Sequence, residues 1–546
     1  MIEDISAQIA ATLADRGSGT IFGVPGGGNN LEMIGAAESH GVRFVLAHTE
    51  TAATIMAGVD AELSGRVSAS IVTRGPGAAS AVNGVAQAML DRQPLLMLSD
   101  TVSQADSDRV SHQLLDQRQM FGAVSKWSTV IGSAEPAHTI AAALDVATSG
   151  RPGPVHLDID PTSDLGSPPP PVAAGPRGEL TRALEVVATA RRPVVLVGIG
   201  GRSHGEQIRR IVAGSGTPVM MTYKAVGALP DSDPHVAGLF TGALSDAMVL
   251  HEADVIVCIG LDTVELIPNP WNLDATIISL AQWPETHPYF EPDLEVVGDL
   301  ATLLPEIPEI TADWGANVVA AHRARISEVL MSGAAPDLGV APWDIVSVTR
   351  AAADAGSIAT VDAGAHMLAA MPLWKTERPG ELLISSGLAT MGFALPAAIA
   401  AAIRQPDRRT YCFVGDGGLG MALAELETVI RLALPITIVV FNDSRLTLIE
   451  LKQKPRGHGG AGAVSYRPTD FAMIAAAVGI ASRRIEDLPE LTRAVSHSSS
   501  TQGPELLDVL VDSSAYRHVI DVVRHGTNGS AVGPRQTVVP SWSAGR

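Results

Sequence analysis

Two aspartates in the last third of the chain, Asp416 and Asp443, are placed where their side chains could hold one metal ion. Asp416 follows the apolar run 411–414, and Asp443 follows the β-branched run 436–440. The apolar residues between these runs have helical spacing and stop before Pro435. This pattern predicts a strand, a crossover helix and a parallel strand, which brings both carboxylates to the same edge of a sheet.

A pair of carboxylates at such an edge suits a hard divalent cation. Neighbouring strands lie about 4.8 Å apart, so two acidic side chains at adjacent strand ends can reach one ion. Mg²⁺ takes a few protein oxygens and completes its octahedron with water and phosphate. Gly415, Gly417 and Gly418 would let a diphosphate approach the backbone N–H groups at the helix start. A Gly-Asp-Gly sequence alone is more often a solvated turn, so its position between two strands carries the prediction.

The composition argues against several classes of partner. The formal net charge of the 546 residues is −20, and nucleic acids and anionic membranes both attract basic surfaces. The two cysteines, Cys258 and Cys412, lie in apolar runs, which predicts buried thiols in a reducing cytoplasm. Residues 1–17 predict an amphipathic helix and no secretory signal, and no window is apolar enough for a membrane span. We therefore expect a cytoplasmic protein with no nucleic-acid or membrane partner.

Short apolar runs alternate with helical stretches, which predicts an α/β protein built from doubly wound parallel sheets. The four consecutive prolines within residues 161–178 continue neither a helix nor a central strand, so this segment is a predicted linker. We expect an N-terminal domain at 1–165, a central domain at 180–330, a C-terminal domain at 340–530 and a tail at 531–546. The strands expected in the first two domains are 21–24, 43–46, 69–72, 95–98, 194–197, 219–222 and 255–259.

The sequence Gly198-Ile199-Gly200-Gly201 follows one of the expected strands and is similar to the start of a dinucleotide-binding fingerprint. The remaining spacing of that fingerprint and its acidic ribose partner are not evident. A structural turn is the favoured interpretation.

Six segments together resemble the thiamine-diphosphate-dependent superfamily of acetolactate synthases and 2-oxo acid decarboxylases. One is the Gly-Asp-Gly sequence with its following strand, which resembles the family's GDG…N motif. The others are FGVPGGGNNLEMI (22–34), a glutamate helix with a TRGPG turn (45–94), HQLLDQRQMFGAVSKW (112–127), TVDAGAHM (360–367) and SSGLATMGFALPAAIAA (385–401). The resemblance covers most of the chain and implies pyrimidine-binding, central and diphosphate-binding domains, in that order.

The resemblance implies that thiamine diphosphate is held through Mg²⁺. Asp416, Asp443 and the carbonyl of Arg445 match the family's metal ligands. The family usually has two asparagines where this chain has Asn442-Asp443, which leaves Asn442 as the alternative ligand.

The resemblance also implies which residues contact the rest of the cofactor. Glu50 matches the acid that bonds pyrimidine N1′ and promotes the imino tautomer, which removes the proton from thiazolium C2. Met391 matches the apolar wedge between the two rings, and Gly387 matches the residue whose carbonyl accepts from the 4′-amino group. The other expected cofactor-binding residues are Gly364, His366, Gly415, Gly417, Gly418, Leu448 and Ile449. Ala365 replaces a glutamine common in acetolactate synthases, which leaves one diphosphate contact open.

On the substrate side, the resemblance points to Gly27, His112 and Gln113. The glycine loop around Gly27 leaves space over the thiazolium, and Gln113 matches an active-site glutamine of acetolactate synthases. His112 and Gln113 also fit an ordinary surface loop. The glycine-rich segment 454–463 fits a mobile lid or a flexible solvated loop equally well.

These implications give a leading function and two alternatives. The leading one is thiamine-diphosphate-dependent decarboxylation of a small-molecule 2-oxo acid, with aldehyde release or carboligation to a second carbonyl. The first alternative is a true acetolactate synthase, and the second is a silent regulatory homologue, against which Glu50 and Asp416 argue. Acetolactate synthases usually bind FAD with an arginine in the segment aligned to 260–266, and this chain has none there. We therefore expect FAD to be absent or dispensable, and the assembly to be a homodimer or homotetramer.

Overall fold

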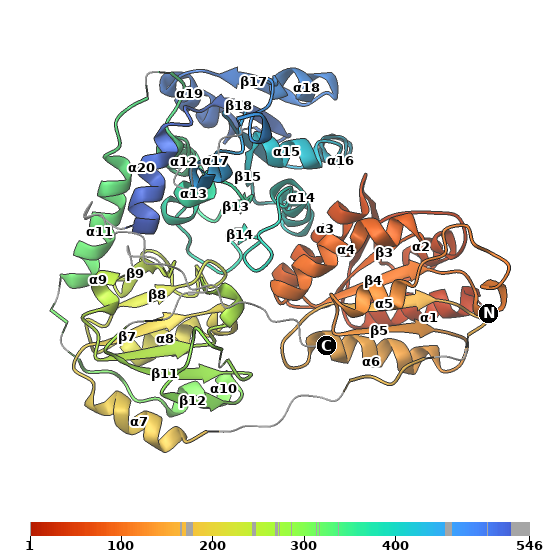
Figure 1. Cartoon of the computed structure of the whole chain (residues 1–546), viewed down its shortest axis with the longest axis horizontal. Helices are drawn as coiled ribbons and strands as arrows, with labels where there is room; N and C mark the ends of the chain where they lie inside the picture. Colours follow the sequence, from red (N-terminus) through yellow and green to blue (C-terminus); the bar gives the residue numbers. More distant parts are fainter. Residues whose placement is uncertain are drawn as a thin grey trace.

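The structure is a computed structural model that contains three α/β domains (Figure 1). The residues it describes are 2–163, 166–170, 178–242, 247–267, 271, 273–285, 287–312, 314–315, 317–336, 338–453, 461–499 and 501–525. Each domain has one six-stranded sheet whose strands all run parallel, with helices on its faces. The predicted fold class is confirmed. The tail at 531–546 and most of the segment 454–463 lie outside the described residues.

The N-terminal sheet has the strand order β2-β1-β3-β4-β6-β5. The four strands expected at 21–24, 43–46, 69–72 and 95–98 are present, as is the N-terminal helix. The strands are β1 (Thr20–Val24), β2 (Arg43–Leu46), β3 (Ser68–Val72), β4 (Leu95–Asp100), β5 (Trp127–Ile131) and β6 (Val155–Ile159). The helices are α1 (Ile2–Asp15), α2 (Asn29–Ser39), α3 (Glu50–Ser64), α4 (Pro76–Leu90), α5 (Gln117–Gly122) and α6 (Pro136–Thr148).

The central sheet has the order β12-β11-β10-β7-β8-β9, and its three expected strands are also present. The strands are β7 (Pro193–Val197), β8 (Val219–Met221), β9 (Val236–Leu239), β10 (Val255–Ile259), β11 (Thr276–Ala281) and β12 (Leu294–Val297). The helices are α7 (Leu180–Thr189), α8 (Gly205–Val212), α9 (Ala247–Leu250), α10 (Leu300–Leu303) and α11 (Val318–Met331), the last of which leads to the C-terminal domain.

The C-terminal sheet has the order β14-β13-β15-β16-β18-β17. Its strands are β13 (Ile358–Val361), β14 (Leu382–Ile384), β15 (Thr410–Gly415), β16 (Ile436–Asn442), β17 (Ala481–Ile485) and β18 (Glu505–Leu510). Its helices are α12 (Pro342–Ala352), α13 (Met367–Leu373), α14 (Ala394–Arg404), α15 (Asp416–Ala422), α16 (Glu425–Arg431), α17 (Thr447–Gln453), α18 (Phe471–Ala477), α19 (Leu488–Ser498) and α20 (Ala515–Ile520). Strands β15 and β16 are adjacent and parallel, as the sequence predicts.

The crossover between β15 and β16 differs from the single helix that the spacing predicts. The chain forms two short helices, α15 and α16, separated at residues 423–424. The second helix begins at Glu425, whose buried side chain accepts the backbone N–H groups of His48 at 3.0 Å and Thr49 at 3.1 Å. The break therefore turns Glu425 toward the N-terminal domain, a contact that local spacing does not reveal.

The N-terminal and C-terminal domains share one hydrophobic core where α3 packs against α14 (Figure 1). Alanines on both helices, including Ala53 and Ala57 of α3 and Ala397 and Ala401 of α14, are fully buried there. Small side chains let two helix backbones approach closely, so this contact fixes the two domains relative to each other. None of the described helices is long and apolar enough to cross a membrane.

Candidate active site

Asp416 and Asp443 end adjacent strands and face one another across a shared backbone donor. The N–H of Arg445 donates to Asp416 Oδ2 at 3.2 Å and to Asp443 Oδ1 at 3.1 Å. Ser444 has φ +57°, and this left-handed turn brings Arg445 back to the two carboxylates. In the described part of the chain, no third histidine, cysteine or acidic side chain joins them.

The two carboxylates lie in an environment that disfavours two negative charges. Burial raises the pKa of Asp416 to about 6. Burial raises the pKa of Asp443 to about 7, with the nearby Asp416 acting in the same direction and the Thr447 hydroxyl opposing it. A divalent cation between them would compensate both charges, so the pair suits a metal that takes few protein oxygens.

Asn442, the alternative metal ligand, has its side chain engaged elsewhere. Its amide donates to Asp508 Oδ1 at 2.8 Å and to the carbonyl of Thr469 at 2.9 Å. Asn442 is buried and Asp508 fully buried, which ties the end of β16 to β18. Asp443 is therefore the one of the two neighbours that lies beside Asp416.

A cavity of about 360 Å³ opens beside the two aspartates. This volume lies in the usual range for small-molecule and cofactor sites, about 300–1,000 Å³. Eleven of the residues predicted for the cofactor and metal line it: Gly364, His366, Met391, Gly415, Asp416, Gly417, Gly418, Asp443, Arg445, Leu448 and Ile449.

Glycines are required where the cavity wall approaches buried side chains. A methyl group on Gly418 would lie 2.4 Å from Asp362 Oδ2, and one on Gly364 would lie 2.6 Å from the ring of His366. A methyl on Gly417 would lie 3.3 Å from the end of Met391. The absence of side chains at these glycines thus avoids clashes with Asp362 and His366 and leaves the cavity unfilled.

His366 lies deep in this wall as a neutral ring. It is buried, stacks on Phe441 with ring centroids 5.1 Å apart, and its Nε2 has no hydrogen-bond partner among the described residues. Burial lowers the pKa of His366 to about 4, although backbone groups of Asp362 and Phe413 act in the opposite direction. A neutral imidazole with an unsatisfied nitrogen can donate to or accept from a ligand that enters the cavity.

Gly387 is the predicted cofactor-binding residue of this domain that the structure does not place in the cavity. A methyl on it would lie 2.6 Å from the Leu90 side chain, so it packs on the N-terminal domain instead. Ala389, two residues later, lines the cavity and has φ +52°. Tyr516 of α20 also lines it and was not predicted, because nothing local in its sequence marks a residue so distant from Asp416.

The residues predicted in the N-terminal domain gather at the carboxyl end of its own sheet. A methyl on Gly77 would lie 3.2 Å from a carboxylate oxygen of Glu50, and one on Gly26 would lie 2.2 Å from the Thr73 hydroxyl. A methyl on Gly75 would likewise lie 2.8 Å from the Gln113 side chain. These contacts join the glycine loop, the glutamate helix and the TRGPG turn.

The surroundings of this second cluster are open. A methyl on Gly27 would meet nothing within 4 Å, and His112 is exposed. The buried Gln117, which was not predicted, accepts the N–H of Gly75 at 2.8 Å and donates to Asp158 at 2.6 Å. Gln117 thereby fixes the turn beside Gln113.

The two clusters do not form one site within the chain. All the residues that line the 360 Å³ cavity belong to the C-terminal domain, so Glu50, His112, Gln113 and Gly27 lie outside it. The chain therefore carries two candidate half-sites on separate domains.

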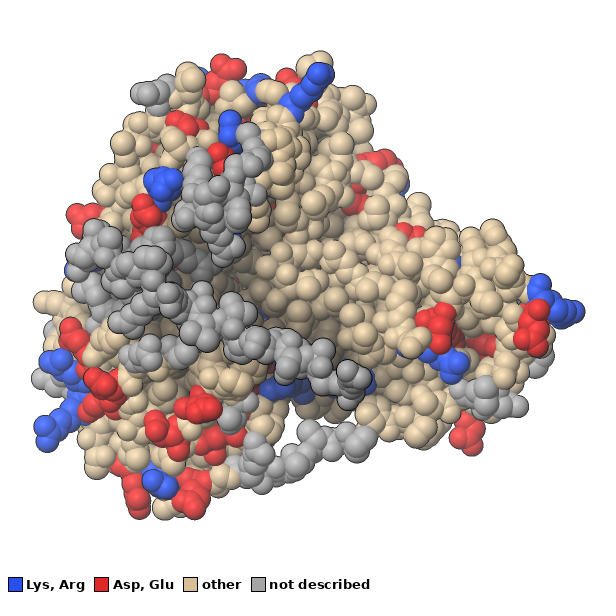
Figure 2. Space-filling view, viewed as in Figure 1, with Lys and Arg blue, Asp and Glu red and all other residues tan. Residues whose placement is uncertain are grey.

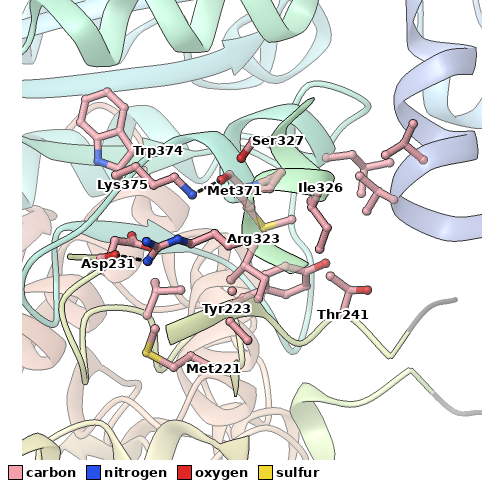
Figure 3. Close-up of a pocket in the computed structure, with 18 residues that line it drawn as sticks. Met221, Tyr223, Asp231, Thr241, Arg323, Ile326, Ser327, Met371, Trp374 and Lys375 are labelled. Carbon is pink, nitrogen blue, oxygen red and sulfur yellow. Dashed lines mark hydrogen bonds between the residues drawn. The ribbon is translucent and has the colours of Figure 1, made fainter. Parts of the chain in front are cut away.

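A smaller cavity, of about 50 Å³, lies between the central and C-terminal domains (Figure 3). Its walls are largely apolar, with Met221, Ile326 and Met371 among them. Its cationic side chains are held by the protein: Lys375 Nζ donates to the Pro372 carbonyl at 3.0 Å and Arg323 to the Asp231 carbonyl at 2.6 Å. None of the predicted site residues lines this cavity, and it is too small for a cofactor.

The sequence matches three families of domains. Residues 3–120 match the N-terminal TPP binding domain of thiamine pyrophosphate enzymes, residues 180–307 match their central domain, and residues 362–509 match their C-terminal TPP binding domain. These matches contain both half-sites, and thiamine pyrophosphate is the same compound as thiamine diphosphate.

Curated proteins similar to this chain over most of its length include acetolactate synthases. The acetolactate synthase of Bacillus subtilis (strain 168) is 28% identical over 532 residues, which cover 92% of each chain. The catabolic acetolactate synthase of Raoultella terrigena is 28% identical over 92% of this chain and 94% of its own. The large subunit of acetolactate synthase isozyme 2 of Escherichia coli (strain K12) is 29% identical over 92% of this chain and 95% of its own.

Proposed function

Because the chain belongs to the thiamine-diphosphate-dependent superfamily of acetolactate synthases and 2-oxo acid decarboxylases, we propose that it is a carboligase of the acetolactate synthase type. In this reaction a 2-oxo acid loses CO₂ and its remaining acyl group is joined to the carbonyl of a second 2-oxo acid. The observation that carries the proposal is the Asp416–Asp443 pair in the wall of a cofactor-sized cavity.

The residues of the C-terminal cavity fit thiamine diphosphate bound through Mg²⁺. Asp416 and Asp443 would hold the metal, and the thin glycine wall at Gly415 and Gly417 leaves room for a diphosphate. His366 offers a neutral polar nitrogen that the described protein leaves unsatisfied. When bound, the cofactor supplies a carbon nucleophile that stabilises negative charge after decarboxylation.

The chain's own groups supply proton control and water exclusion. Glu50 would place a carboxyl on the pyrimidine ring, where a positioned acid can hold or return a proton. Met391 and Leu448 line the cavity with apolar surface, which excludes water from the reacting atoms and strengthens the nearby hydrogen bonds. Gln113 and His112 would supply polar groups to the substrate from the N-terminal half-site.

A complete site needs a second copy of the chain, because Glu50 and the cavity lie in separate half-sites. The surface supports this arrangement: Leu31 beside the glycine loop and Met421 of α15 are each 62% exposed. Figure 2 shows that few charged side chains lie in the middle of the face it views, where the N-terminal and C-terminal domains meet. We propose a homodimer, or a tetramer built from such dimers, in which one protomer supplies Glu50 and its partner the cavity.

The central domain supports an enzyme that works without flavin. The N–H of Ile199 donates to Glu265 Oε2 at 2.9 Å, and the N–H of Gly200 donates to the Gly260 carbonyl at 2.8 Å. The glycine turn after β7 is therefore already occupied by a carboxylate and a carbonyl from the chain itself. A dinucleotide phosphate would need these same N–H groups, which Glu265 and the Gly260 carbonyl already occupy.

Aldehyde release is the second candidate, since decarboxylation precedes both outcomes. The two are distinguished by supplying pyruvate to protein reconstituted with thiamine diphosphate and Mg²⁺. Carboligation converts two pyruvates and one proton into acetolactate and one CO₂, whereas release gives one acetaldehyde per CO₂. We expect acetolactate, or the homologous product of another 2-oxo acid in a panel, to account for most of the CO₂. Aldehyde at one equivalent per CO₂ with every substrate would contradict carboligation, and no CO₂ from any of them would contradict the proposed function.

A further inference from the structure

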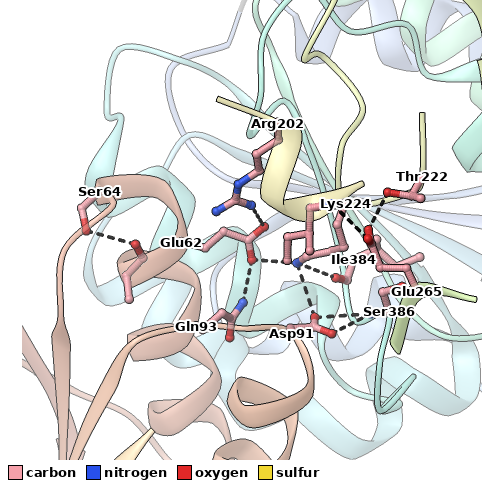
Figure 4. Close-up of polar contacts among 12 residues, drawn as sticks. Glu62, Ser64, Asp91, Gln93, Arg202, Thr222, Lys224, Glu265, Ile384 and Ser386 are labelled. Carbon is pink, nitrogen blue, oxygen red and sulfur yellow. Dashed lines mark hydrogen bonds and ion pairs between the residues drawn. The ribbon is translucent and has the colours of Figure 1, made fainter. Parts of the chain in front are cut away.

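Asp91 caps the carboxyl end of helix α4 of the N-terminal domain, where all three domains meet (Figure 4). The Asp91 side chain is fully buried, and its Oδ1 accepts the N–H of Gly387 at 2.8 Å and that of Ser386 at 3.1 Å. These two donors belong to the loop 385–391, which joins β14 to the segment before α14. The same loop ends at Met391 in the cofactor cavity.

A second contact holds the far end of this loop to the same helix. The hydroxyl of Thr390 donates to Asn83 Oδ1 of α4 at 2.9 Å, and its N–H donates to the Ser385 hydroxyl at 3.1 Å. Between the two ends lies Ala389, whose φ of +52° is costly for a residue with a side chain. Such a conformation persists only where its surroundings hold it, and here α4 holds the loop at both ends.

The charge of Asp91 is compensated by a buried lysine of the central domain. Lys224 has a side chain that is 2% exposed, and its Nζ lies 2.7 Å from Glu62, 3.4 Å from Asp91 and 3.3 Å from the Ile384 carbonyl. One cation therefore joins α3, α4 and the end of β14, as Figure 4 shows. A buried carboxylate without such a partner would be strongly destabilising.

We propose that Asp91 is a positioning residue for the reaction: it sets the conformation of loop 385–391 and so places Met391 in the cofactor cavity. Lys224 provides the charge that lets a carboxylate occupy this buried position. The inference rests on the proposed function, because the position of Met391 matters to catalysis only if the cavity binds the cofactor.

The test compares two substitutions of Asp91 by titrating thiamine diphosphate into cofactor-free protein at saturating Mg²⁺. Asp91→Ala removes the acceptor of two backbone N–H groups, and we expect the Kd of thiamine diphosphate to rise at least about tenfold, since small misplacements in a preorganised site are costly. Asp91→Asn keeps an oxygen that can accept from Gly387, so its Kd should stay within about threefold of the parent value.

Asp262 provides a matched control at the same junction. Its side chain is also fully buried and joins the N-terminal and central domains by accepting from Arg92 at 2.6 and 3.0 Å, but its described hydrogen bonds do not reach loop 385–391. Asp262→Asn should lower the melting temperature while leaving the Kd of thiamine diphosphate unchanged. A Kd that rises equally in Asp262→Asn and Asp91→Ala would show a general stability effect and overturn the inference.

If the Asp91→Ala protein does not fold, Asn83→Ala tests the same loop. Asn83 is exposed, so its truncation should leave the melting temperature unchanged, and the loss of its bond to Thr390 should weaken cofactor binding by about threefold. Unchanged affinity in this variant would also overturn the inference. A parent protein that binds no thiamine diphosphate would instead contradict the proposed function itself.

Discussion

Asn442 and Asp443 are neighbours in the chain, but their side chains serve different parts of the structure. The Asn442 amide donates to Asp508 at 2.8 Å inside the C-terminal sheet, whereas Asp443 lies in the cavity wall beside Asp416. Successive residues at the end of a strand point to opposite faces, which separates the two roles. The resemblance to the family leaves both residues open as metal ligands, and this geometry favours Asp443.

This relationship predicts opposite outcomes for two alanine substitutions. Asp443→Ala should weaken the binding of Mg²⁺ and thiamine diphosphate at least about tenfold, because it removes an oxygen from the metal site. Asn442→Ala should change that affinity by less than about threefold but lower the melting temperature, because the buried Asp508 loses a donor. Calorimetric titration and thermal unfolding of both variants provide the measurements.

The control for this prediction is Asp443→Asn, which keeps an oxygen at the same place and should retain most of the affinity. If Asn442→Ala weakens cofactor binding more than Asp443→Ala does, the metal ligand is Asn442 and the assignment is shifted by one residue.

The occupied glycine turn of the central domain predicts that purified protein carries no flavin. Glu265 already accepts the N–H of Ile199 at 2.9 Å, so the position of a dinucleotide phosphate is filled by a side chain. The protein should be colourless above about 400 nm, where bound oxidised flavin absorbs. Its activity should be unchanged by added FAD. Yellow protein with one flavin per chain would mean that Glu265 moves aside and that the site is functional.

The sequence predicts the parallel β15–β16 pair because each strand is a continuous apolar run that ends in a turn sequence. It predicts most of the cavity wall for a different reason, namely the resemblance of short motifs. The division of the crossover at residues 423–424 escapes prediction because Glu425 bonds to His48, which lies 377 residues away in the chain. Tyr516 escapes it for the same reason, since only the folded chain brings α20 to the cavity.

The positions of Gly387 and Ala389 show a limit of motif resemblance. A motif identifies a loop, but it does not specify which residues of that loop line a cavity. The structure places Ala389 rather than Gly387 in the cavity, and the positive φ of Ala389 has no signature in an alanine-rich sequence. Likewise, the pairing of Asp91 with Gly387 depends on a contact across 296 residues.

Glu62 at the three-domain junction predicts a specific acid sensitivity. Burial alone would raise the pKa of Glu62. The neighbouring Lys224 and Arg202 outweigh burial and lower this pKa to about 2, against an ordinary value of 4.5. A lowered folded-state pKa stabilises the protein fully above the unfolded value, and that stability is lost as the pH falls from 4.5 toward 2. The melting temperature of the parent should therefore fall more steeply between about pH 5 and pH 3 than that of Glu62→Gln.

The control for the acid prediction is Glu252→Gln. Glu252 pairs with Arg192 at 3.1 Å, but both side chains are more than half exposed, so solvent screens the pair. Its pH profile should follow the parent. If the melting temperatures of the parent and of Glu62→Gln fall in parallel as the pH is lowered, Glu62 does not make the stability of the protein sensitive to acid.

Glu50 is the residue on which the proposed activation depends most. Glu50→Gln keeps the shape of the side chain but cannot exchange a proton, so turnover of the best 2-oxo acid should fall by about 10²- to 10⁴-fold. The C2–H/D exchange of bound thiamine diphosphate should slow in parallel, while cofactor affinity should change less, because the proposed metal ligands and the cavity lie on the C-terminal domain. Exchange as fast as in the parent would reduce Glu50 to a charge at the start of α3.

The separation of the two half-sites allows one further test, by mixing inactive variants. In a homodimer of the proposed kind, Glu50→Gln and Asp416→Ala each inactivate both sites. A mixed dimer has one intact site, formed by Glu50 from the Asp416→Ala chain and the cavity of the Glu50→Gln chain. Random exchange of equal amounts should therefore restore about a quarter of the parent activity, because about half of the dimers are mixed. If Glu50 served the cavity of its own chain, every mixed dimer would stay inactive, and sedimentation showing an active monomer would lead to the same conclusion.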